Sequence, residues 1–205
     1  IILIAVVLIT VNIRSMFPSL FLAAHHALFQ VASIITTTGY STVDFDKWPQ
    51  LSRTIMVLLM FIGACAGSTG GGIKVSRVLI LLKSVKKELK QYLHPSAVEK
   101  IKMDGKIVEH EVVRSTNVFM VAYVLIFAVS VLLISLDEYD LVTNFTAVTA
   151  TFNNIGPGLA LVGPTGNFGF FSNFSKLVLI FDMLAGRLEI FPLLLLFSRE
   201  TWKRF

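Results

Sequence analysis

Apolar residues in this chain fall in long blocks separated by polar stretches, a pattern typical of helices that cross a membrane. Residues 115–136 include no charged residue, and at ~1.5 Å per residue such a helix extends about 33 Å, enough to cross the bilayer core. Residues 174–198 and 51–82 form two further blocks of spanning length. The second is interrupted by glycines at Gly63, Gly67, Gly70, Gly71 and Gly72. We therefore predict an all-α membrane protein.

Two other apolar segments, residues 18–35 and 141–152, are too short to span. The second would form about 18 Å of helix, roughly half the thickness of the membrane. Each is followed by a polar, glycine-containing stretch and then by one of the long blocks. We therefore expect two half-helices that enter the membrane, each followed by a loop that returns to the side of entry.

Charged residues make up only 15% of the chain, and the basic ones are concentrated. Ten of the eighteen Lys and Arg residues lie between Lys74 and Arg114, beside a spanning block. Under the positive-inside rule this placement predicts a cytoplasmic loop, and it accounts for the net charge of +5 without a nucleic-acid partner. With both short segments returning to the outer side, basic residues 199–204 also fall inside, and Asp44 and Asp46 fall outside as solvated charges.

The order of spanning helix, short helix, polar glycine turn and long helix occurs twice along the chain. The sequence SIITTTGYST around Gly39 corresponds to ATFNNIGPGL around Gly156, and the glycine-broken stretch at 67–72 corresponds to MLAGRLE at 183–189. The offset is near 117 residues in both comparisons. Two matches at one offset predict an internal duplication, and four such units around one axis would enclose a pore.

The polar turns after the half-helices suit the binding of a dehydrated cation. Backbone carbonyls can replace hydration oxygens without adding charge, but they face inward only where the backbone adopts conformations that glycine permits. The turn TTTGY at 36–40 has this composition, and NNIGPG at 153–158 is its counterpart. A half-helix also directs its partly negative C-terminal end toward the membrane centre, which favours a cation there. The alternative is a simple turn between two helices.

Four segments in this order resemble TrkH/KtrB-type potassium transporters: TTTGY at 36–40, GACAGSTGGGIKVSR at 63–77, NNIGPGL at 153–159 and GRLEIFPLLLLF at 186–197. The resemblance covers nearly the whole chain. It implies a pseudo-tetrameric pore, similar to that of a K⁺ channel, built from four helix–pore-loop–helix repeats. The chain would supply the third repeat at 1–94, a cytoplasmic linker at 95–113 and the fourth repeat at 114–205. Within the linker, Asp104 and Gly105 between alternating apolar residues predict a short β-hairpin, with an unstructured loop as the alternative.

The resemblance also implies site residues. K⁺ would bind at the filter carbonyls only, and the filter positions are Thr36, Thr37, Thr38, Gly39, Asn153, Asn154, Ile155 and Gly156. The gate below the filter would comprise Gly70, Gly71, Gly72, Lys74 and Arg187. Consecutive glycines do not sustain a stable helix, and a buried guanidinium both donates to freed carbonyls and opposes the passage of a cation. The alternatives are a close helix–helix contact for the glycines and an ion pair with Glu189 or Asp182 for Arg187.

By this resemblance the protein takes up K⁺, the transported ion, across the cytoplasmic membrane of a bacterium or archaeon through a gated pore. This chain would bind no cofactor. It would contact membrane lipid, form a homodimer and be regulated by a cytoplasmic nucleotide-binding subunit of the TrkA or KtrA type. Candidate docking surfaces for that subunit are residues 83–106 and the cytoplasmic C-terminal residues 199–205, and anionic lipid head groups are the alternative partner of the lysines.

Other classes of function are open on the residues alone. A secondary transporter of a small solute would use a broken helix in each repeat, and only the third repeat is rich in glycine here. A structural membrane protein gives no reason for polar glycine turns at half-membrane depth. An enzyme is not expected, because the one cysteine and four histidines form no nucleophile–base or metal-ligand pattern. Because the chain opens inside an apolar run without Met, we expect it to be a piece of a longer protein.

Overall fold

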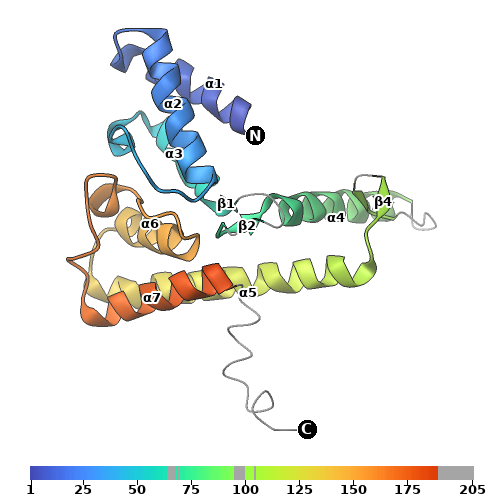
Figure 1. The fold of residues 1–205 in the computed structure, drawn as a ribbon. Helices are drawn as coiled ribbons and strands as arrows, with labels where there is room; N and C mark the ends of the chain where they lie inside the picture. Colours follow the sequence, from blue (N-terminus) through green and yellow to red (C-terminus); the bar gives the residue numbers. More distant parts are fainter. Residues whose placement is uncertain (64–67, 69, 95–99, 104, 189–205) are drawn as a thin grey trace.

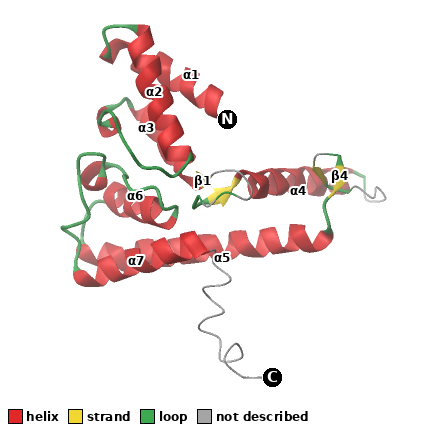
Figure 2. Cartoon of the chain, viewed as in Figure 1, coloured by secondary structure: helices red, strands yellow, loops and turns green. Residues whose placement is uncertain are grey.

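The computed structural model describes residues 1–63, 68, 70–94, 100–103 and 105–188, and this part of the chain is mostly helical (Figures 1 and 2). Its α-helices are α1 Ile2–Ile13, α2 Leu20–Ile35, α3 Gln50–Phe61, α4 Val75–Leu93, α5 His110–Ile134, α6 Leu141–Phe152 and α7 Asn173–Leu188. Strand β1 Ile62–Gly63 pairs in parallel with β2 Ile73–Lys74, and β3 Lys102–Met103 pairs antiparallel with β4 Lys106–Ile107.

Helix α5 is the long apolar span that the sequence predicts at 115–136. With the 3₁₀ turn Ser135–Asp137 it extends from His110 to Asp137, and it is the one helix among the described residues that is long and apolar enough to cross a membrane. Helix α7 covers the start of the predicted block at 174–198. The remainder of that block lies outside the described residues.

The two short helices have the lengths that the sequence predicts. Helix α2 contains 16 residues and α6 contains 12, and α6 begins and ends at the predicted positions. Each begins at a side-chain cap, because the Ser19 hydroxyl accepts a hydrogen bond from the amide of Leu22 and the Asp140 carboxylate accepts one from the amide of Thr143. Most of α6 is buried, since α3, α5 and α7 all contact it.

The helices form two groups, each with its own apolar core (Figure 1). Helices α1, α2 and α3 pack around residues such as Ile9 and Met56, whereas α5, α6 and α7 pack around Ile134 and Phe152. Ile155, in the segment that follows α6, is buried in the first core. The chain after α6 therefore reaches across and joins the two groups.

The glycines at 63–72 predict that the block at 51–82 is interrupted, and it does not form one continuous helix. Helix α3 ends at Phe61, the chain passes through β1 and β2, and α4 begins at Val75. Gly72, in this break, has a φ of 79°, a left-handed conformation that is costly for a residue with a Cβ. Helix α4 then packs along α5, and the predicted hairpin of β3 and β4, with Gly105 at its turn, lies beside the C-terminal half of α4 (Figure 1).

Candidate functional site

The turns that follow α2 and α6 have positive φ at the same two positions. Thr37 and Asn154 have φ values of 55° and 54°, and Gly39 and Gly156 have φ values of 79° and 114°. Both pairs are separated by 117 residues, the offset at which the sequence motifs recur. Positive φ is uncommon in residues other than glycine. Its recurrence at the matched Thr and Asn positions therefore indicates that the two turns are structurally related.

The hydrogen bonds of the two turns also match at this offset. In each turn the amides donate hydrogen bonds to carbonyls in the last turn of the preceding short helix. The matched bonds are Thr37 N to Ile34 O (3.0 Å) with Asn154 N to Thr151 O (3.0 Å), and Thr38 N to Ser33 O (2.9 Å) with Ile155 N to Ala150 O (2.8 Å). Since the amides are directed toward the helix, the carbonyls of the turn are directed away from it.

Several carbonyls of these turns accept no backbone hydrogen bond from the described residues, although Ile155 is buried and its carbonyl lies against Gly39. No backbone amide among the described residues donates to the carbonyl oxygens at 36–38 or 154–155. The Thr36 hydroxyl bonds back to the Ala32 carbonyl at 2.7 Å and lies 2.8 Å from the Thr38 hydroxyl, so it does not cover them. Thr36, Thr38 and Gly156 are exposed in this chain. Unpaired carbonyls on an exposed turn are the groups that coordinate a dehydrated cation in a filter.

The two turns are in direct contact with each other. A Cβ built on Gly39 would overlap the carbonyl of Ile155 and would lie 3.3 Å from Cδ of Pro157. Only a residue without a side chain lets the first turn approach the second this closely. The C-terminal ends of α2 and α6 therefore converge on one place, between the two helical groups (Figure 1).

The glycine segment between α3 and α4 packs against the second turn. A Cβ on Gly71 would overlap the carbonyl of Asn153, and a Cβ on Gly63 would overlap the carbonyl of Gly71. A Cβ on Gly72 would lie 3.1 Å from Oδ1 of Asn153. These glycines therefore make their close contact with the polar turn. The alternative interpretation of the sequence was a close contact between two helices.

Four of the five predicted gate residues line one cavity of about 100 Å³: Gly70, Gly72, Lys74 and Arg187. The fifth, Gly71, lies against the turn above it. Tertiary structure thereby brings the glycine break next to a basic residue more than a hundred positions further along the chain. Residues 64–67 and 69 of the glycine-rich break, and Glu189 as the alternative partner of Arg187, lie outside the described residues.

Helix α7 approaches the second turn through Gly186, the residue before Arg187. A Cβ on Gly186 would overlap the carbonyl of Phe152 and would lie 2.9 Å from Nδ2 of Asn154. That same Asn154 amide donates to the carbonyl of Met183 at 3.0 Å. These contacts fix the last turn of α7, and with it Arg187, directly beside the turn.

Residues 4–204 match the TrkH family, described as a cation transport protein. The chain belongs to this family. It is 40% identical over 190 residues to the Trk system potassium uptake protein TrkH of Escherichia coli strain K12, a match that covers 93% of this chain and 39% of that protein. It is 44% identical over 181 residues to the protein of the same name from Vibrio parahaemolyticus, covering 88% of this chain and 37% of that protein.

A solved TrkH structure has the same fold. The crystal structure of the potassium transporter TrkH from Vibrio parahaemolyticus matches with a TM-score of 0.89 and 40% identity, covering 99% of this chain and 43% of that chain. The predicted family and the helical membrane fold are therefore confirmed, and the family is one of transporters, not of enzymes. The chain spans about two fifths of the length of the relatives it matches.

One side-chain contact of the second turn in this TrkH-family chain is not evident from the sequence. The Tyr123 hydroxyl of α5 donates to Oδ1 of Asn153 at 2.8 Å, and both side chains are buried. The Asn153 amide in turn donates to the carbonyl of Thr149 at 2.8 Å. Sequence reasoning placed Asn153 in the filter for its carbonyl, but its side chain also ties the turn to α5. The one sign of this contact in the sequence was a tyrosine, with its polar hydroxyl, inside the apolar segment 115–136.

A second buried polar pair joins the two long helices of this group. The Ser130 hydroxyl of α5 donates to Oδ1 of Asp182 in α7 at 2.6 Å, and Asp182 is fully buried. Its other carboxylate oxygen has no hydrogen-bond partner among the described residues. Intramembrane carboxylates are expensive and face protein, so this pair sets how α7 lies against α5.

Asp46 corrects one expectation from the sequence. It was predicted to be a solvated outer charge, yet its Oδ1 accepts a hydrogen bond from the amide of Ala160 at 3.0 Å and lies 2.9 Å from a guanidinium nitrogen of Arg53. Asp46 thereby links the segment after the first turn to the segment after the second. The sequence could not reveal this, because Asp46 and Ala160 are 114 positions apart.

Proposed function

We propose that this chain is the part of a TrkH-type potassium uptake protein that supplies two of four pore-loop repeats. The observation that carries the proposal is the match of the two turns, in φ and in hydrogen bonds, at one offset of 117 residues. The names of the relatives, Trk system potassium uptake protein and potassium transporter, support K⁺ as the transported ion.

In this proposal the chain is divided into two repeats and a linker, and each repeat contains one of the two glycine turns. The third repeat occupies residues 1–94, with α1, half-helix α2 and the broken pair α3 and α4. The fourth occupies residues 114–205, with α5, half-helix α6 and α7. Residues 95–113 form the linker that contains the hairpin. The remaining two quarters of the ring would come from the rest of the whole protein, and this chain by itself would surround only half of a cation's path.

In the filter, carbonyls would replace the water around K⁺. The eight positions are Thr36, Thr37, Thr38 and Gly39 in one turn, and Asn153, Asn154, Ile155 and Gly156 in the other. Support comes from the absence of amide donors to the carbonyls at 36–38 and 154–155 among the described residues, and from the half-helices whose negative ends meet at these turns. K⁺ enters here as substrate, and the chain itself would bind no cofactor.

Below the filter, the cavity of Gly70, Gly72, Lys74 and Arg187 would act as the gate. The positive charge of Arg187 would oppose the passage of K⁺ by Coulomb repulsion in a medium of low dielectric constant. Movement of the glycine segment would open the path, since Gly71 and Gly72 contact the turn without side chains that would lock them.

We place the protein in the cytoplasmic membrane of a bacterium or archaeon, as a multi-pass protein with the linker and C-terminus inside. The basic residues of the linker region support this orientation. In the whole protein we expect a homodimer in membrane lipid, with a nucleotide-binding regulatory subunit of the TrkA or KtrA type on the inner face. A secondary transporter of small solutes is not favoured, because α7 is continuous from Asn173 to Leu188, where that mechanism needs a break.

The test is K⁺ and Na⁺ flux in vesicles that contain the complete protein. Gly39→Ser places a side chain against the Ile155 carbonyl in the filter, and we expect K⁺ flux or the preference for K⁺ over Na⁺ to fall by about tenfold or more, because carbonyl geometry sets both. Gly105→Ser is the matched control, since Gly105 has nearly the same φ of 78° but no atom within 4 Å of an added Cβ. Unchanged flux and selectivity in Gly39→Ser would refute the filter assignment.

A further inference from the structure

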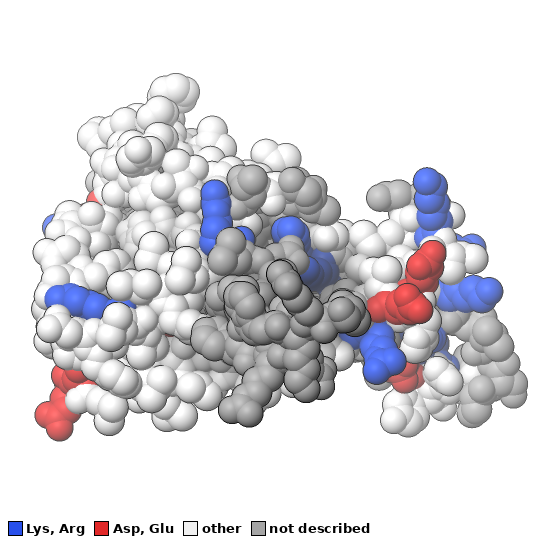
Figure 3. All heavy atoms as spheres, turned by 60° about the horizontal axis from the view of Figure 1, so that its bottom comes forward, with Lys and Arg blue, Asp and Glu red and all other residues white. Residues whose placement is uncertain are grey.

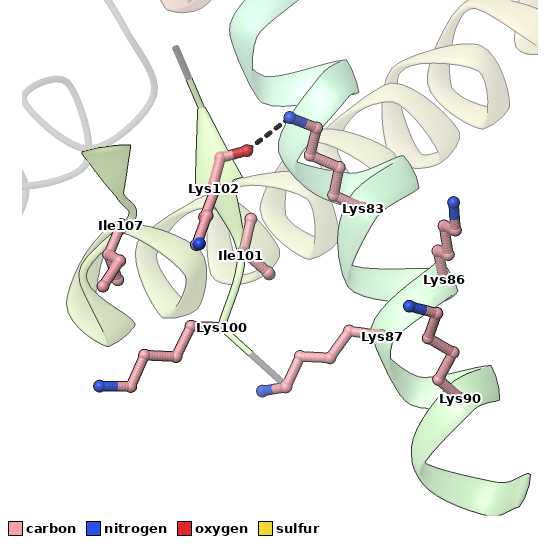
Figure 4. A pocket seen from close by; sticks show the side chains of 8 residues that line it. All are labelled: Lys83, Lys86, Lys87, Lys90, Lys100, Ile101, Lys102 and Ile107. Atoms are coloured by element: carbon pink, nitrogen blue, oxygen red, sulfur yellow. Dashed lines mark hydrogen bonds between the residues drawn. The ribbon is translucent and has the colours of Figure 1, made fainter. Parts of the chain in front are cut away.

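A basin of lysines lies where α4 meets the hairpin (Figure 4). It has a volume of about 640 Å³, and six of its eight lining residues are lysines: Lys83, Lys86, Lys87, Lys90, Lys100 and Lys102. Four come from α4 and two from the hairpin side, so two separate elements contribute charge to one hollow. Ile101 and Ile107 supply its apolar wall.

Helical spacing explains the α4 part of the basin. Lys83, Lys86, Lys87 and Lys90 are spaced i, i+3, i+4 and i+7, which places them on one face of a helix. The hairpin is held against this face, because the Lys83 ammonium donates a hydrogen bond to the carbonyl of Lys102, which Figure 4 marks with a dashed line. The hollow is therefore built by tertiary structure and is not merely a basic stretch of sequence.

An exposed apolar stripe runs along the adjacent face of α4. Leu82, Val85, Leu89 and Tyr92 are spaced i, i+3, i+7 and i+10, and their exposed fractions are 62%, 58%, 61% and 84%. A helix with one basic face and one apolar face that no other part of the described chain covers is typical of the membrane interface. The stripe therefore fits lipid chains beside the basin.

The basin lies at the boundary between the membrane span and the polar hairpin. Helix α4 packs along α5, and the apolar span of α5 begins just after the hairpin, at His110. In Figure 3 several Lys and Arg side chains gather over this end of the molecule, formed by α4 and the hairpin, with acidic side chains among them. The acidic residues Glu88 and Glu109 line a neighbouring cavity that shares Lys87 and Lys100 with the basin, and no acidic residue is among the described residues that line the basin itself.

We propose that this basin binds the phosphate group of an anionic phospholipid, with the acyl chains lying along the stripe of Leu82, Val85 and Leu89. Lysines from two elements line this hollow, so an anion placed there is attracted to their ammonium groups. A lipid phosphate supplies that anion, and its attached chains cover the exposed apolar face, so one ligand satisfies both surfaces. A soluble phosphate or an acidic protein segment would leave the stripe uncovered.

Lipid retention by the complete protein tests the proposal. The protein is purified, supplied with equal amounts of dioleoyl-phosphatidylglycerol and dioleoyl-phosphatidylcholine, and the bound lipids are counted by native mass spectrometry. We expect preferential retention of phosphatidylglycerol and a loss of about tenfold or more in that retention when Lys83, Lys86, Lys87 and Lys90 are all changed to Gln, given the attraction that each lysine adds.

Matched variants separate charge from folding. Changing the same four residues to Arg keeps the charge and should keep retention. Lys100→Gln should weaken retention, whereas Lys106→Gln, on the same hairpin but outside the basin, should not. K⁺ flux is measured in parallel, because it reports on the proposed filter. If the proposed transport function is wrong, the flux experiments fail while lipid retention is unaffected.

Three results would each overturn the proposal. The first is equal retention of the two lipids by the unmodified protein. The second is competition of inorganic phosphate with phosphatidylglycerol at comparable concentration, which would assign the basin to a soluble anion. The third is unchanged lipid retention in the four-Gln variant. If that variant also lost binding to a TrkA-type regulatory subunit, the lysines would be assigned to a protein partner.

Discussion

Gly39 lies directly against the backbone carbonyl of Ile155, although the two residues are separated by 116 positions in the sequence. There is no space between them for even a single methyl group. The two residues belong to turns of matching conformation, so the contact sets the distance between two carbonyl-bearing loops. The spacing of any cation site formed there therefore depends on the absence of a side chain at position 39.

Gly39→Ala should destabilise the protein as well as affect its transport. The new Cβ overlaps a carbonyl and must also adopt a φ near +79°, so we expect a loss of more than about 1 kcal/mol in the free energy of unfolding. Thermal unfolding of the complete protein in detergent measures it. Gly105→Ala carries the same backbone strain in open space and should lose less. Equal losses in the two variants would mean that the Ile155 contact contributes nothing.

Tyr123→Phe should loosen the second turn from α5. Removing the hydroxyl leaves the buried Asn153 Oδ1 without its donor, at a cost of about 1–3 kcal/mol in the free energy of unfolding. Because this oxygen also lies near Gly72, we expect altered K⁺ flux along with a lower unfolding temperature. Tyr92→Phe, at a position 84% exposed on α4, is the control and should change neither quantity. A Tyr123→Phe protein with unchanged stability and flux would contradict the role assigned to this bond.

Ser130→Ala should weaken the packing of α7 on α5. It removes the only hydrogen bond that the described residues give to the Asp182 carboxylate, which is fully buried. Loss of a bond to such a group costs about 1.5–3 kcal/mol, measurable as a lower unfolding temperature. The control is Ser135→Ala, whose exposed hydroxyl only bonds back to the carbonyl of Val131. If both serine variants unfold at the same temperature, the helix pairing does not depend on Asp182.

Acid should weaken the cap of α6. The pKa of Asp140 is lowered from 3.8, first because the Thr143 hydroxyl donates to its carboxylate and next because the Thr143 amide does. A lowered pKa in the folded state means that the stabilisation is complete above the ordinary pKa and disappears as the pH falls through the folded value. Stability should therefore decline below about pH 4.

Thr143→Val tests this cap. Removing the hydroxyl raises the pKa of Asp140 toward its ordinary value, so the cap should contribute less stability at neutral pH, and the loss in acid should be smaller and complete at a higher pH. Unfolding temperatures between pH 3 and 7 measure the change. Thr54→Val, at an exposed Thr of α3 whose hydroxyl bonds only to the carbonyl of Gln50, should leave the pH profile unaltered. If Thr143→Val and the unmodified protein had identical pH profiles, the cap would not be the source of the loss of stability in acid.

Several features of the fold could be predicted because they depend on local chemistry. The span at 115–136, the half-helix at 141–152 and the hairpin turn at Gly105 follow from apolar length and turn residues, and each is present. The roles of side chains were harder to predict. Asp46 was expected to be a solvated charge, but it joins two distant segments, and the hydrogen bond between Tyr123 and Asn153 was not anticipated.

The sequence by itself determined the long apolar helix α5, the two short helices α2 and α6, and the matching glycine turns that follow the short helices. These properties depend on residues that are close along the chain, through apolar length, glycine content and helix capping. Only the tertiary structure decided that Gly39 contacts Ile155, that Arg187 lies at the cavity of Gly70 and Gly72, and that the hairpin closes the lysine basin. Such contacts depend on the packing of helices more than a hundred residues apart, or on the docking of a hairpin onto a helix, and no local pattern of side chains specifies these.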